Sequence, residues 1–104
     1  MEVTFRISNI PNMAAATRKQ LPFAIIDGSD IVLQSRLSPD TPLNDHLVWL
    51  WGMLQNERRF LKSLVSEGAL LTVYVTRHVG AVEIKANGAE MLHLLGANLL
   101  VEAP

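Results

Sequence analysis

Alternating apolar and polar positions predict several short β-strands. Val3, Phe5 and Ile7 alternate with polar residues, which is typical of a strand with one buried face. An Asp27-Gly28 pair separates the next two apolar runs and favours a tight hairpin turn, because glycine tolerates a positive φ. The segment 77–80 is expected to join a second hairpin in the same way. We therefore expect strands over the ranges 3–8, 23–26, 31–37, 70–76, 81–85 and 99–101.

Helical periodicity is strongest between residues 43 and 67. One apolar stripe at about 100° per residue is formed by Leu43, Leu47, Leu50, Leu54, Leu61 and Val65. Glu57 and Arg58 interrupt this stripe, which predicts a bend or break near Gln55-Asn56. Thr41 is expected to cap the helix, with Pro42 at its first position, and Gly68 is expected to end it.

Two shorter helices are expected on either side of this segment. The Ala-rich stretch 13–20 suits a short helix, and a loop is the alternative. Asn87 with Glu90 three residues later reads as a capping box that opens a last helix ending at Gly96.

These elements predict a single α+β domain over residues 1–104. The strands and helices fit a two-layer architecture in which a mostly antiparallel sheet has its helices packed on one face. The other face is expected to be polar, and it is either solvated or a binding surface. Its expected residues are Thr4, Arg6, Thr72, Tyr74, Thr76, Glu83 and Lys85.

The long helical segment carries more apolar surface than one stripe requires. Trp49, Met53 and Phe60 lie on a flank about 100° away from the leucine line, with Trp51 nearer to it. Exposed together, these side chains would be typical of an interface with a partner protein or a second copy. The alternative is that the first helix or the C-terminal segment covers them.

Charge and composition exclude several classes of protein. Nine Lys and Arg residues against ten Asp and Glu give a net charge of −1, which argues against nucleic-acid binding. The chain has no cysteine, so disulfides, thiolate metal sites and cysteine nucleophiles are excluded. No apolar run approaches the roughly 18 residues that span a bilayer. We expect a cytoplasmic protein that does not bind membranes.

No motif for catalysis is present in the sequence. The three histidines have no metal-ligand spacing, and there is no nucleophile motif or phosphate-binding loop. Arg58, Arg59 and Lys62 form one basic cluster, for which pairing with neighbouring glutamates is the simplest interpretation. We therefore expect no metal and no cofactor.

The second part of the chain resembles a bacterial domain-of-unknown-function family, family 4279. The resemblance covers about residues 31–101 and lies in three segments, 43–47, 60–64 and 90–99, together with Leu50 and Leu54. It implies an α+β fold and a bacterial, cytoplasmic protein. The family has no established catalytic residues to carry over.

The sequence favours a non-enzymatic protein-interaction module, forming a homodimer or a complex with another protein through Trp49, Met53 and Phe60. An immunity-type protein or a mobile-element accessory protein would fit this size and class. The alternative is a small-molecule-binding domain or a weak enzyme with a pocket between sheet and helices. Its polar groups would be Arg6, His46, Tyr74 and His78.

Overall fold

The computed structural model describes residues 1–18 and 21–103 of the chain. In chain order, its elements are β1 (Glu2–Ser8), α1 (Met13–Thr17), β2 (Ile25–Asp27), β3 (Asp30–Gln34), α2 (Leu43–Leu54), the 3₁₀ turn η1 (Gln55–Glu57), α3 (Arg58–Ser66), β4 (Leu70–Thr76), α4 (Ala86–Leu95) and β5 (Asn98–Val101). Lys19 and Gln20, the end of the expected first helix, lie outside the described residues.

The five strands form one sheet in the order β2-β3-β1-β4-β5. β1 lies at its centre and pairs antiparallel with both β3 and β4, while β2 extends β3 through a hairpin whose turn contains Gly28 at φ +62°. β5 pairs parallel with β4 at the other edge. The expected mostly antiparallel sheet is therefore confirmed.

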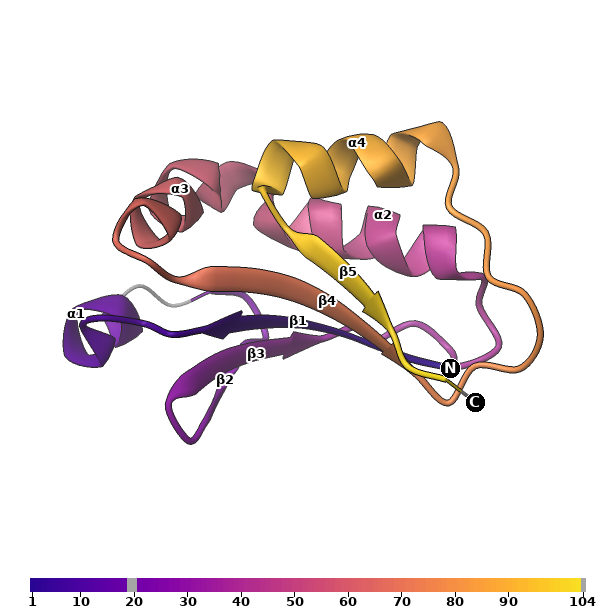
Figure 1. Ribbon diagram of the computed structural model, residues 1–104, viewed down its shortest axis with the longest axis horizontal. Coiled ribbons are helices and arrows are strands. Elements are labelled where there is room, and N and C mark those ends of the chain that lie inside the picture. The colour runs from indigo at the N-terminus through magenta and orange to yellow at the C-terminus, as the bar shows by residue number, and fades with distance from the viewer. Residues whose placement is uncertain (19–20, 104) are drawn as a thin grey trace.

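The alternation in the sequence decides which face of the sheet is buried. Val3, Phe5 and Ile7 of β1 are at most 1% exposed, and the residues between them are half-buried. The helices α2, α3 and α4 all lie on the side of the buried residues (Figure 1), which confirms the two-layer α+β fold. We call the opposite side the open face, and Thr4, Arg6, Thr72, Tyr74 and Thr76 share it as expected.

The expected break in the long helical segment is confirmed. α2 ends at Leu54, η1 follows, and α3 begins at Arg58. The break keeps Leu54 and Leu61 in the core without drawing the charged residues between them inward. It also rotates α3, so Leu64 is buried where the stripe had placed Val65, which is 40% exposed.

The predicted strand at 81–85 is wrong. The place beside β4 is taken by β5, with Thr72 opposite Asn98 and Val75 opposite Val101. Lys85 is held at the helix layer, because its backbone N–H donates to Oδ1 of Asn44 at 2.9 Å. Glu83 and Lys85 therefore lie outside the sheet, and they are not part of its open face as predicted.

The predicted helix caps are displaced by one or two residues. Pro42 is itself the N-cap of α2, without a side-chain cap bond, so Thr41 does not cap it. Lys85 is the N-cap of α4, which places Asn87 inside the helix. Asn87 instead accepts hydrogen bonds through Oδ1 from the Gly88 N–H and from Nδ2 of Asn44, both at 2.9 Å.

The contact between α2 and α4 depends on a glycine. Gly88 is buried against Asn44 and Leu47, and a Cβ there would overlap the Asn44 side-chain oxygen and lie 3.1 Å from Leu47. Asn44 cannot retreat without losing its bonds to Lys85 and Asn87. The absence of a side chain at residue 88 therefore sets the distance between the two helices.

Two helical glycines should respond oppositely to alanine. Gly88→Ala should lower the free energy of unfolding by about 1–3 kcal/mol, because it overpacks a fixed contact. Gly52→Ala, at an exposed position of α2, should raise it by up to about 1 kcal/mol, since nothing lies within 4 Å of the added Cβ and alanine favours helix. Urea unfolding of both variants measures this difference, and equal effects would contradict the proposed close contact.

Candidate functional site

The three residues predicted to form an interface are neither enclosed nor fully exposed. Trp49 and Met53 on α2 and Phe60 on α3 are half-buried and pack against the core, as does Trp51. The flank is thus partly covered from within the chain. The elements that cover this flank show which apolar side chains stay exposed beside it.

The covering elements come from the segment before β2 and from α1. The ring of Phe23 stacks on Trp49 with 6.5 Å between centroids and 27° between planes. Phe60 borders a shallow hollow whose other wall is formed by α1, including Ala16, and by its N-cap residue Asn12. The apolar flank of α2 therefore continues outward into Phe23.

Phe23 holds an unusual position for a bulky residue. Its backbone φ is +59°, a left-handed conformation that costs about 1–3 kcal/mol in a non-glycine residue. The residue is 53% exposed, and the guanidinium carbon of Arg36 lies 4.0 Å from the centroid of its ring. An aromatic ring is thus held at the surface between an indole and an arginine, which are the side chains enriched in binding hot spots.

The exposed apolar surface continues along β2. Ile25 and Ile26 are 64% and 61% exposed and point to opposite faces of the sheet. β2 is an edge strand, so its outer backbone groups face away from the sheet. We call Phe23, Ile25 and Ile26 the edge patch. Beside it, on the open face, is a hollow of about 250 Å³ lined by Phe23, Ile25, Val32, Gln34, Ser35 and Arg36.

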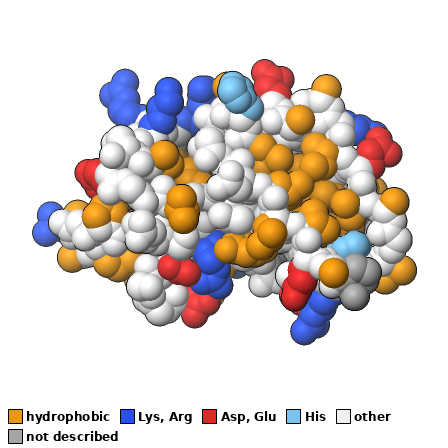
Figure 2. All heavy atoms as spheres, viewed as in Figure 1, with side chains coloured by type: hydrophobic (Ala, Val, Ile, Leu, Met, Phe, Trp, Pro, Cys, Tyr) orange, Lys and Arg blue, Asp and Glu red, His pale blue; other side chains and the backbone are white. Residues whose placement is uncertain are grey.

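The charges next to the edge patch are paired. Arg6 on β1 donates to Asp30 at 2.6 Å and to Asp27 at 2.9 Å. These hydrogen bonds, first to Asp30 and then to Asp27, raise the pKa of Arg6. Acidic and basic side chains lie side by side near the β2–β3 hairpin at the lower rim of the space-filling view (Figure 2). The two carboxylates thus hold the hairpin on β1 and are engaged by a cation.

The four polar groups predicted for a ligand pocket do not converge. Arg6 and Tyr74 lie on the open face of the sheet. His46 lies on α2, in the helix layer on the other side of the sheet, and is 1% exposed. His78 lies in the loop after β4, where its two ring nitrogens face the carbonyl oxygens of Gly80 and Glu102 at 3.1 and 2.8 Å. His78 therefore joins this loop to the C-terminal segment.

His46 forms a buried polar contact with Ser35. Nδ1 lies 2.7 Å from Oγ of Ser35, which also accepts the Leu37 N–H at 3.3 Å. Nε2 is buried and makes no hydrogen bond within the described part of the chain. Burial lowers the pKa of His46, because it disfavours the charged imidazolium. With the imidazole of His46 neutral, this contact holds the segment after β3 against α2.

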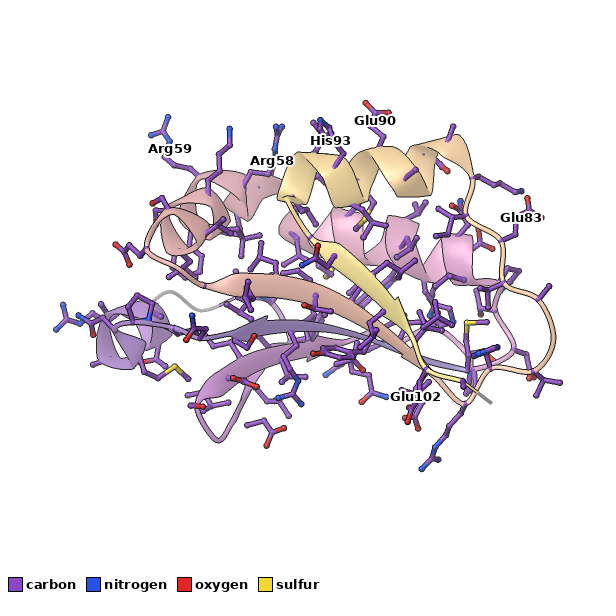
Figure 3. All side chains as sticks on the ribbon, viewed as in Figure 1. Arg58, Arg59, Glu83, Glu90, His93 and Glu102 are labelled. Carbon is purple, nitrogen blue, oxygen red and sulfur yellow. The ribbon has the colours of Figure 1, made fainter. Side chains whose placement is uncertain are left out.

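The basic cluster of Arg58, Arg59 and Lys62 projects from α3. Arg58 and Arg59 extend outward from the helix layer together with His93 and Glu90 of α4 (Figure 3). The guanidinium carbon of Arg58 lies 5.8 Å from the ring of Trp51. This arrangement is that of a solvated helix surface.

Among residues 1–18 and 21–103, no group of three His, Cys, Asp or Glu side chains is placed to hold a metal ion. No helix in the same ranges is long and apolar enough to cross a membrane. The edge patch is the feature of this surface that needs explanation.

Comparisons with family models, with curated proteins and with solved structures gave no match for this chain. The resemblance to family 4279 accordingly stays an expectation from the sequence. The function must be argued from the geometry of the chain itself.

The buried histidine predicts a specific pH dependence. The unfolded chain binds a proton at His46 near the ordinary pKa of about 6.5, whereas the folded chain binds it only at lower pH. The contribution of His46 to stability is therefore complete above about pH 6.5 and is lost as the pH falls.

The free energy of unfolding, measured in urea between pH 7.5 and 5, should fall less steeply in His46→Gln than in the unchanged protein. His93→Gln, which alters an exposed histidine of α4, is the control and should keep the original slope. An unchanged slope in His46→Gln would show that this histidine is not the group concerned.

Proposed function

We propose that this protein is a non-enzymatic protein-interaction module that binds another protein chain through the edge patch. The observation that carries the proposal is the exposure of Phe23, Ile25 and Ile26, each more than half exposed, on one edge of the sheet. Apolar side chains gathered at an unpaired strand edge are typical of strand addition by a binding partner. Trp49 supports the patch from beneath through its stack with Phe23.

The strained backbone at Phe23 supports the same proposal. A left-handed phenylalanine at the surface costs stability, and this residue stays more than half exposed. Residues held in such conformations cluster at functional sites, because the surrounding structure must hold them there. Binding a partner would bury the exposed part of this residue.

The site differs from the predicted one in its centre. The sequence placed the contact on Trp49, Met53 and Phe60, and the proposed contact keeps Trp49 as the support of an exposed Phe23. Met53 and Phe60 then serve mainly to join α2 and α3 to the core. We place this binding in the bacterial cytoplasm, as the family resemblance implies, where an immunity-type or accessory role would use such a surface.

Photo-crosslinking from the edge patch tests the proposal. Phe23 is replaced by the photoreactive analogue p-benzoylphenylalanine, and the matched control carries it at His93, an exposed position on α4. Position 23 should give protein adducts of discrete mass at five or more times the yield of position 93. The adducts should disappear when Ile26→Lys is added, because a lysine on an edge strand opposes pairing.

Ile26→Lys should leave the fold intact. Ile26 is mostly exposed, so the free energy of unfolding should change by no more than about 0.5 kcal/mol. Equal crosslinking from positions 23 and 93 in a folded protein would refute the proposed contact surface.

A further inference from the structure

We infer that the chain bound at the edge patch is a second copy of this protein, with β2 of one copy antiparallel to β2 of the other across a two-fold axis. This inference rests on the proposed function and names its partner. It would join two five-stranded sheets into one continuous sheet with β2 strands at its centre.

The edge of β2 is complementary to itself. An exposed strand edge is completed by another extended strand, whose backbone supplies the missing hydrogen bonds. Because Ile25 and Ile26 point to opposite faces, the added strand must bring apolar side chains on both faces. β2 itself has this pattern, and in an antiparallel pair the two copies present it to each other with the same faces aligned.

The two ends of the strand are complementary in charge. Phe23, with Arg36 over its ring, lies at the start of the β2 segment, and Asp27 ends it. Antiparallel pairing brings the end of one strand beside the start of the other. Asp27, which is 61% exposed, would then lie near Arg36 of the second copy, and the two-fold axis repeats the pair.

The hairpin charges do not oppose this pairing. The two β2–β3 turns lie at opposite ends of the paired strands, so the carboxylates of the two copies are kept apart. Within each copy, Asp27 and Asp30 are already bonded to Arg6. A charge placed on an edge strand normally discourages pairing, and here it is partly neutralised.

The other edge of the sheet is the competing surface. Hydrophobic side chains gather over α2 and β5 in the space-filling view (Figure 2), and Leu100 of β5 is 53% exposed. Leu99 and Val101, however, point to the helix side and are half-buried. β2 therefore presents apolar side chains on both faces, whereas β5 exposes one on the open face.

Because the chain has no cysteine, single cysteines report contacts between copies without interference. We would place one at Ile25 or at Ile26, and matched controls at Leu100 on the opposite edge and at Val79 in a 95% exposed loop position. Directly opposed residues of an antiparallel pair lie about 4.5–5.5 Å apart at Cα, within the range that a disulfide spans. Mild oxidation should therefore give at least tenfold more covalent dimer from position 25 or 26 than from either control.

Sedimentation of the unchanged chain provides the second measurement. Its mass should rise with concentration from the 11.5 kDa monomer toward twice that value, and Ile26→Lys should remain a monomer. Arg36→Glu should weaken the dimer at least tenfold, while Arg59→Glu on α3, away from the edge, should not.

Two results would overturn the inference. One is a monomer at all concentrations up to millimolar with no disulfide from positions 25 and 26. The other is preferential crosslinking from Leu100, which would place the contact on the β5 edge. If photo-crosslinking from position 23 still gives adducts with other proteins in the first case, the proposed function stands and only its partner changes. If those adducts are also absent, both fail.

Discussion

The burial of one face of β1 is the constraint on which the rest of the structure depends. Phe5 and Ile7 are covered by the helix layer, and the same strand pairs on both sides, with β3 and with β4. Because side chains alternate along a strand, shifting β1 by one residue would bring Arg6 into the core and expose Phe5. The register of β1 thus sets which face of β3 and β4 meets the helices. It also places Arg6 where it holds the β2–β3 hairpin.

Local sequence patterns correctly predicted those elements that depend only on the residues of one short segment. Alternation in β1 and β4, the Asp27-Gly28 turn and the charged interruption at Glu57 and Arg58 each led to an element that the structure contains. The prediction of a strand at 81–85 was wrong. The apolar alternation of this segment could not show that β5, which follows α4 in the chain, pairs with β4 instead. Nor could spacing show that Asn44 fixes Lys85 at the helix layer. These are long-range contacts, and a sequence pattern does not contain them.

The sequence predicted only part of the candidate site, because long-range contacts decide the rest. The excess of apolar surface on α2 was visible from Trp49 and Met53, and the first helix was one of its expected covers. The stack of Phe23 on Trp49 was not expected. Ile25 and Ile26 belong to a predicted strand, but its place in the sheet was not predicted, because the order of strands cannot be read from their composition. Only the position of β2 at the edge turns these two residues into exposed surface. The positive φ at Phe23, which is unfavourable for phenylalanine, gives no sequence signal at all.

The two edge strands of the sheet, β5 and β2, are attached to the rest of the fold in different ways, and this difference bears on the proposed function. β5 is joined to the body of the fold by the parallel crossover through α4 and by the contact of His78 with the Glu102 carbonyl. β2 is joined to β3 by strand pairing and to β1 by the bonds from Arg6. Phe23 has a strained backbone and covers Trp49, yet it is itself 53% exposed. Under the proposed function, pairing of this edge with another strand would supply the missing backbone partners and bury the exposed part of Phe23, and it would thereby account for both the strain and the exposure.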